Sequence, residues 1–412
     1  MMPSARKFLL ALTFSVLAVS LLPATSMAAS SGDVIGSPKL LVAGPMNLLV
    51  IAVDFPDFPH TLSIDNLTRR TIAELNAYYG TVSYGVVSVT GRVVGWIRMP
   101  NKLSTYGADN GPFIDAGSSG GMEPDTWMLL RDAMPKVTES LSNYDKVFIL
   151  HAGFGQESSG QANDIWSVTF LDYELETKQG KILHAFAVVP EFEAHDFSTA
   201  GVYTHEFGHL LDLPDLYSNT AEQVGPWDLM ARGCWLGDPL GSTPAEFTSW
   251  SRLELGWLRS QFVYEMDTEM PTQETIDLRP VELPPIPGEF SAALVYVNAK
   301  QYYLIEVRVH IGFDTALPEE GVLISEVTKD KLSIISAQPK GKTLTDAAWQ
   351  PGSVFHQTVH IDLVGSTNSA TKQKSADLYI AIAARTGNVY TITVSFQGPP
   401  LIFAAPLTGL GA

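Results

Sequence analysis

The sequence predicts an α+β protein, with an α/β region at 45–260 followed by an all-β, sandwich-like region at 261–412. Up to about residue 260, continuous apolar runs typical of buried strands alternate with segments of helical periodicity. Beyond Leu258, short alternating runs separated by Pro- and Gly-rich breaks dominate. The chain has 412 residues and 45% are hydrophobic, which is enough apolar material for two cores.

In the α/β region, four segments are predicted to be strands: Asn47–Asp54, Val86–Trp96, Tyr144–His151 and Lys181–Val189. The predicted helices are Ser63–Tyr79 with Gly80 as C-cap, Pro124–Met134, Ser198–Leu211, and one that begins at the capping box Thr243-Pro244-Ala245-Glu246 and ends before Gly256. In the all-β region the strand candidates are Ala292–Val297, Tyr302–Val309, Gly321–Val327, Leu378–Ala383 and Val389–Phe396.

The first 28 residues have the pattern of a secretory signal peptide. Two basic residues precede an apolar run from Phe8 to Leu22, and Ser26-Met27-Ala28 supplies small residues for cleavage. The run is short for a membrane span. We therefore expect a secreted, extracellular protein without stable membrane insertion, in which a short segment at 29–44 precedes the first domain.

The charge balance and the cysteine count exclude several classes of protein. A net charge of −18 would be repelled by phosphate backbones, which argues against a nucleic-acid partner. The single cysteine, Cys234, allows no intramolecular disulfide and no cysteine-based zinc site. Stability must therefore come from the apolar cores, with bound ions as a further contribution.

One segment of the chain has the residue types and the spacing of a metal site. In His205-Glu206-Phe207-Gly208-His209, the two histidines are four residues apart within a predicted helix. Residues at i and i+4 share one helix face, so both imidazoles can bind one metal ion. Glu206 is adjacent to the first of them and can act as general base toward an activated water.

A third ligand is expected shortly after this helix. Asp215 lies six residues past His209, and Pro214 ends the helix so that the chain can turn back. Asp212, at i+3 from His209, is the alternative ligand or a partner of an imidazole. Glu254 on a later helix is a further alternative, as in thermolysin-like enzymes. Met230, in a turn-prone segment, is expected to lie beneath the metal.

The spacing resembles the extended zinc motif of metzincins, and the wider sequence is similar to secreted bacterial metalloproteases of the immune inhibitor A type. The similar stretches before the metal segment are 53–57, 83–85, 151–153 and 165–167. Those after it are 227–230, 244–250, 255–257, 303–308, 312–314 and 317–318. The resemblance covers roughly 45–330 and implies a metzincin-like catalytic domain at 45–260, followed by the β-rich domain at 261–412.

The resemblance implies a secreted zinc-dependent endopeptidase acting on protein or peptide substrates. Zinc would be held by His205, His209 and Asp215, with Glu206 as general base and Tyr217 as a candidate oxyanion donor. The family has glycine at position 212, where this chain has Asp212. An aspartate tolerates the left-handed backbone better than most residues, so the turn is expected to survive.

Three further expectations accompany this function. Because of the departure at position 212, the alternative is a catalytically inactive relative that acts as an extracellular binding protein. A substrate is expected to add to a sheet edge, with Lys181–Val189 as the candidate strand. Asp54 and Asp57 follow the first strand, where they form either a calcium site or turn caps.

Overall fold

The computed structural model describes residues 41–108, 124–171, 175–176, 180, 182–217, 222–266, 273–298, 300–329, 331–338, 343–362, 373–396 and 398–400. The expected signal peptide at 1–28 lies outside these ranges. None of the helices in the described part of the chain is both long and apolar enough to span a bilayer.

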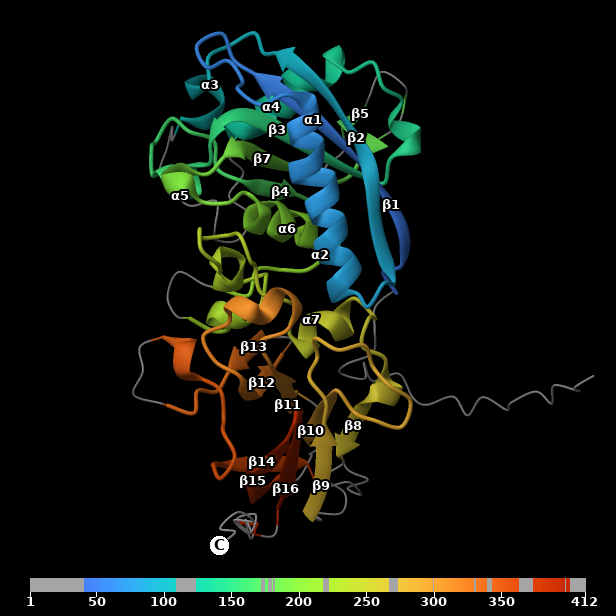
Figure 1. Cartoon of the computed structure of the whole chain (residues 1–412), viewed down its shortest axis with the longest axis vertical. Coiled ribbons are helices and arrows are strands. Elements are labelled where there is room, and N and C mark those ends of the chain that lie inside the picture. The colour runs from blue at the N-terminus through green and yellow to red at the C-terminus, as the bar shows by residue number, and fades with distance from the viewer. Residues whose placement is uncertain are drawn as a thin grey trace, which may run out of the picture. The chain divides into compact units, whose positions relative to one another are not determined.

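A five-stranded sheet forms the centre of the α/β region (Figure 1). Its order is β2 (Val87–Arg98), β1 (Gly44–Asp54), β3 (Lys146–Phe154), β7 (Phe186–Phe192) and β4 (Val168–Phe170). All neighbours are parallel except the β7–β4 pair, which is antiparallel. The expectation that Lys181–Val189 forms an edge strand is therefore wrong, because β7 pairs on both sides and β4 is the edge.

Helices cover both faces of this sheet, which explains why β1 is apolar at consecutive positions. One face packs against α1 (Ile64–Thr68), a π-helical turn at Arg69–Ala73, α2 (Glu74–Val82) and α6 (Ala200–His209). The other face packs against α3 (Ser104–Gly107) and α4 (Pro124–Ala133). Alternate residues of β1 enter the two cores, so the strand is buried on both sides.

Two predicted helix boundaries are wrong. Gly80 lies inside α2, which continues to Val82 and is followed by positive φ angles of 57° at Tyr84 and 78° at Gly85. The capping box at 243–246 does not begin a helix. Instead α7 (Ser249–Glu254) begins after Thr248, whose side chain accepts from Ser251 N, and tertiary partners bind the carboxylate of Glu246.

The β-rich region is a sandwich of two sheets. The first has the order β13 (Lys331–Ile334), β12 (Gly321–Thr328), β11 (Gln301–Arg308), β10 (Ala292–Asn298) and β8 (Val263–Met266). The second is the antiparallel sheet β14 (Val354–Asp362), β15 (Gln373–Thr386), β16 (Val389–Ser395) and β9 (Gln273–Leu278). Their facing side chains share one core, as the alternating sequence pattern predicts.

The first sheet of the sandwich also packs against the α/β region. Leu294, Leu304 and Leu323 point away from the sandwich core and belong to the same apolar cluster as α2 and α6. The two regions are therefore joined by a continuous core.

Shorter elements are α5 (Gln156–Ser159), the pair β5 (Leu175–Glu176) and β6 (Ile182–Leu183), and 3-10 turns at Gly225–Trp227, Arg232–Trp235 and Gly312–Ala316.

Candidate metal centre

The two histidines of α6 present their Nε2 atoms to the same space. His205 Nδ1 lies 3.0 Å from Leu229 O, and His209 Nδ1 lies 2.8 Å from Leu213 O. A carbonyl only accepts, so each Nδ1 carries a proton and donates it. In the neutral form of the rings the lone pairs therefore lie on the two Nε2 atoms, which are 3.1 Å apart.

The turn after α6 brings a carboxylate to this pair. Asp212 has a φ of +70°, as predicted for the residue that replaces the family's glycine. Its N–H donates to His209 O, and Leu213 N donates to Gly208 O, which is the Schellman pattern of a helix end. The turn directs Leu213 O at His209 and places Asp215 Oδ1 3.2 Å from both His205 Nε2 and His209 Nε2.

The three converging atoms fit a tetrahedral zinc ion. Ligands about 2.0–2.1 Å from a tetrahedral metal lie roughly 3.3 Å from one another. The separations here are 3.1 Å between the two ring nitrogens and 3.2 Å from each nitrogen to the Asp215 oxygen. Three acceptors at this distance repel one another unless a cation is among them, so the donor set suits a bound divalent metal.

The local electrostatics also favour a positive charge at this point. Burial alone would lower the pKa of His205, but its contacts with Asp215 and Cys234 raise that pKa well above the usual value. Burial alone would raise the pKa of Asp215, but its contacts with His205 and His209 hold it far below the usual value. The carboxylate therefore stays ionised beside the two rings.

The alternative third ligands do not join this group. Asp212 is exposed, and its turn directs the chain onward to Asp215. Glu254 lies on α7 and is outside the group of His205, Glu206 and His209 found in the described ranges, whereas Asp215, also outside that group, contacts both histidines directly. The side chains of the two histidines are 8% and 14% exposed and that of Asp215 is 33% exposed, so the centre opens on the Asp215 side.

Met230 packs directly beneath the metal-site helix. A Cβ at Gly208 would lie 2.5 Å from Met230 Sδ, so the methionine side chain packs closely against the helix at this glycine. The neighbouring Leu229 O accepts from His205, and Met230 O accepts from Leu216 N, the residue after Asp215. Backbone carbonyls of the 227–230 segment therefore contact His205 on one side and the chain next to Asp215 on the other.

Glu206 faces the edge strand of the sheet. Its Oε2 atom lies 2.6 Å from Thr169 Oγ1 on β4, so the threonine hydroxyl fixes the position of the carboxylate. Sequence reasoning missed Thr169, because a single threonine in a three-residue strand has no distinguishing pattern. Its position beside Glu206 depends on the β7–β4 pairing.

A cavity of about 320 Å³ adjoins His205 and Glu206. Its walls include Trp166, Val202 and Trp235, and Tyr217 stands at one side with its ring centroid 6.2 Å from that of His205. Burial, with the charges of Asp215 and Glu206, raises the pKa of Tyr217, so its hydroxyl keeps its proton. Cys234 is buried in the wall of the same cavity.

An unexpected pair of carboxyl groups includes Glu157, which lines this cavity, and its neighbour Glu193. Glu157 accepts from Ser167 N and Oγ, and Glu193 accepts from Ser158 Oγ at 2.5 Å. Burial and then the charge of Glu157 raise the pKa of Glu193 to about 9. The pair therefore retains a proton at neutral pH. Sequence analysis did not identify it, because its members are far apart in the chain.

Asp54 and Asp57 have protein partners. Arg98 donates to both oxygens of Asp54 at 2.6 and 2.9 Å, and His60 Nδ1 lies 2.8 Å from Asp54 Oδ2. Asp57 Oδ1 accepts from Leu103 N. These contacts favour the capping interpretation over a calcium site.

Comparison with known proteins agrees with this geometry. Residues 132–261 match the catalytic domain of the immune inhibitor A peptidase M6 family. Immune inhibitor A from Bacillus thuringiensis subsp. alesti is 27% identical over 215 residues, which are 43% of this chain and 31% of that protein. Pre-pro-metalloprotease PrtV from Vibrio cholerae is 29% identical over 219 residues, 43% of this chain and 23% of that protein.

The resemblance drawn from the sequence is thus confirmed: the chain is similar to the catalytic domain of the M6 peptidases, to immune inhibitor A and to PrtV. It spans about a quarter to a third of the length of these two proteins. Among solved structures, OgpA from Akkermansia muciniphila matches 84% of this chain and 96% of that one, at 13% identity and a TM-score of 0.30.

Proposed function

We propose that this protein is a secreted zinc-dependent endopeptidase that hydrolyses peptide bonds in protein substrates. The observation that carries the proposal is the convergence of His205 Nε2, His209 Nε2 and Asp215 Oδ1 within 3.2 Å of one another. Similarity to M6 peptidases supports the same reaction class. We assign the chemistry to a domain at 45–260, followed by a β-rich domain at 261–412.

In this proposal each site residue has a defined role. His205, His209 and Asp215 hold zinc, which when bound would polarise the scissile carbonyl and lower the pKa of a water molecule. Glu206 accepts a proton from the attacking water and passes it to the leaving amine, so the proton balance closes within one turnover. Thr169 keeps the Glu206 carboxylate in place through its 2.6 Å contact.

The substrate lies along the free edge of β4. This strand pairs only with β7 in the described part of the chain, and it carries Thr169 beside Glu206. An extended peptide adding to this edge would pass the metal centre, and one side chain could enter the adjoining cavity of about 320 Å³. The protonated Tyr217 hydroxyl is the candidate donor to the developing oxyanion.

The alternative, an inactive binding protein, depended on Asp212 in place of the family's glycine. Its φ of +70° is the conformation that the turn requires. The aspartate at position 212 therefore gives no reason to expect that the protein has lost zinc binding.

The test uses the secreted full chain. We expect about one zinc ion per molecule and a casein-cleaving activity that a zinc chelator abolishes. Glu206→Gln should keep the zinc and lose about 10²–10⁴-fold in cleavage rate, the usual contribution of a general base.

Glu254→Gln is the matched control, because Glu254 lies on α7 outside the metal-ligating group; it should keep both zinc and activity. A wild-type protein without zinc, or cleavage that persists in the chelator, would contradict the proposal.

A further inference from the structure

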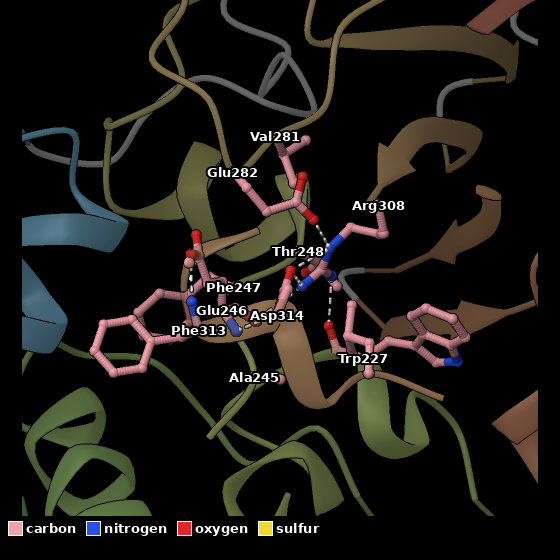
Figure 2. A network of polar contacts seen from close by, with 12 residues as sticks. Trp227, Ala245, Glu246, Phe247, Thr248, Val281, Glu282, Arg308, Phe313 and Asp314 are labelled. Atoms are coloured by element: carbon pink, nitrogen blue, oxygen red, sulfur yellow. Dashed lines mark hydrogen bonds and ion pairs between the residues drawn. The ribbon is translucent and has the colours of Figure 1, made fainter. Parts of the chain in front are cut away.

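A network of buried charges connects the β-rich region to the segment beneath the metal centre (Figure 2). Arg308, the last residue of β11, donates from Nη1 to Trp227 O at 2.6 Å and from Nη2 to Asp314 Oδ2 at 2.5 Å. Its Nε donates to Asp314 Oδ2 at 3.0 Å and to Glu282 Oε1 at 3.2 Å. The side chains of Arg308, Asp314 and Glu282 are 0% exposed, so water does not compete for these bonds.

The same network fixes the start of α7. Asp314 Oδ1 accepts from Glu246 N at 2.8 Å, and Glu306 Oε2 accepts from Ser249 N at 2.5 Å. The carboxylate of Glu246 pairs with Arg252 Nη2 at 2.6 Å. Carboxylates from the β-rich region therefore hold the backbone at 246–249 in place.

The 227–230 segment is held between this network and α7. Arg308 binds Trp227 O, while both oxygens of Asp228 accept hydrogen bonds within 2.8 Å. The donors to Asp228 are Met230 N, Thr248 N, Thr248 Oγ1 and Ser251 Oγ. On its opposite side the segment supplies Leu229 O to His205, and Met230 O to the backbone beside Asp215.

We propose that Arg308 is a positioning residue of the metal centre: by holding Trp227 O it fixes the 227–230 segment, and through that segment the orientation of His205 and Asp215. The inference rests on the proposed function, because it concerns the same three ligands. It makes the β-rich region part of the metal centre's support.

Two stretches of the β-rich region that resemble the peptidase family contribute residues to this network. The stretch 303–308 supplies Glu306 and Arg308, and 312–314 supplies Asp314. Buried ion pairs stabilise a fold little compared with apolar residues, because desolvation offsets their attraction. What a guanidinium adds is a rigid fork of donors, which sets the direction of several partners at once.

Arg308→Lys tests the proposal. Lysine keeps the charge, but one ammonium cannot reach Trp227 O, Asp314 and Glu282 in the arginine geometry. We expect a folded protein whose zinc affinity falls about tenfold, the effect typical of a lost outer partner of a metal ligand. The absorption bands of the Co²⁺-substituted protein should shift, and kcat should fall with KM retained.

The matched control is Arg279→Lys. Arg279 is also an ion-paired arginine of the β-rich region, but its Glu289 partner is 46% exposed and the pair does not touch the 227–230 segment. This variant should keep the zinc affinity and the Co²⁺ spectrum of the wild type. If Arg308→Lys behaves in the same way and loses only thermal stability, Arg308 is structural and the proposal is overturned.

A second variant and a measurement on the wild type cover the case in which Arg308→Lys does not fold. Asp314→Asn removes the charge that anchors Arg308 and should weaken zinc binding similarly. In the unmodified chain, coupling is reciprocal, so zinc should slow amide exchange at 246–249 and 306–314 more than at 378–394. Equal protection of these segments would overturn the proposal.

These outcomes separate the inference from the proposed function. If the wild type binds no zinc, both fail. If the wild type binds zinc and cleaves casein, while Arg308→Lys and Asp314→Asn keep its zinc affinity, only the positioning role fails.

Discussion

The metal centre and the Arg308 network both bury charged groups, but they satisfy them in different ways. In the network, carboxylates meet guanidinium groups or backbone N–H groups of the same chain. In the metal centre, two ring nitrogens and a carboxylate oxygen converge within 3.2 Å, and all three are acceptors when the rings are neutral. Most carboxylate oxygens of the network have a partner within the chain, with Glu282 Oε2 as an exception, whereas the three acceptor atoms of the metal centre face one another and suit a bound cation.

The largest expected effect is on stability, in the Arg308 network. Arg252→Met should lower the free energy of unfolding by about 3–5 kcal/mol, because it leaves the buried Glu246 carboxylate without its 2.6 Å partner. Denaturant unfolding of the zinc-free protein measures this free energy without the contribution of the metal.

Arg279→Met is the control for that change. Its partner Glu289 is half exposed, so the loss should stay below about 1 kcal/mol. Equal losses in the two variants would mean that the network contributes no more than a surface ion pair.

The next largest effect is expected on the zinc affinity of the metal centre. Asp215→Asn should weaken zinc binding by at least about 100-fold, more than loss of an outer partner, because it removes a charged ligand atom. Asp212→Asn should change zinc affinity little, since asparagine also tolerates the left-handed turn. Competition with a chelator gives both values, and the reverse order would make Asp212 the third ligand.

A smaller effect is expected at the edge strand. Thr169→Val removes the hydroxyl that lies 2.6 Å from Glu206 Oε2. The value of kcat should fall about tenfold, which corresponds to about 1.4 kcal/mol and lies near the lower limit for a hydrogen bond to a charged group. Zinc content should not change. Thr68→Val, which removes a helix-internal bond on α1, should leave kcat as it is.

A separate effect is expected on the pH dependence of stability. Burial and Glu157 raise the pKa of Glu193 from 4.5 to about 9 in the folded protein, so unfolding releases a proton between these two values. The wild type should therefore be most stable relative to Glu193→Gln below pH 4.5 and lose this advantage as the pH rises toward 9. Denaturant unfolding of both proteins at pH 5, 7 and 9 measures the difference. Parallel pH profiles would show that Glu193 ionises normally.

Much of the fold could be predicted from the sequence because it depends on local patterns. The continuous apolar run around Leu48–Val53 predicts a strand buried on both faces, and β1 has that burial. The left-handed backbone at Asp212 is likewise a local preference. The edge strand was predicted wrongly, since β7 and β4 differ in their neighbours and not in their own residues. The spacing of Glu246 from Thr243 predicts a capping box, because it does not show that Arg252 binds the carboxylate and Asp314 the backbone N–H of Glu246.

The sequence alone determined that two imidazoles share one helix face, because the spacing of four residues and the helical repeat are local properties. Only the tertiary structure decided that Asp215 approaches the two rings, that Thr169 holds Glu206, and that Arg308 lies behind the 227–230 segment. These contacts join residues from separate elements, and their distances are set by the packing of those elements, which no local pattern encodes.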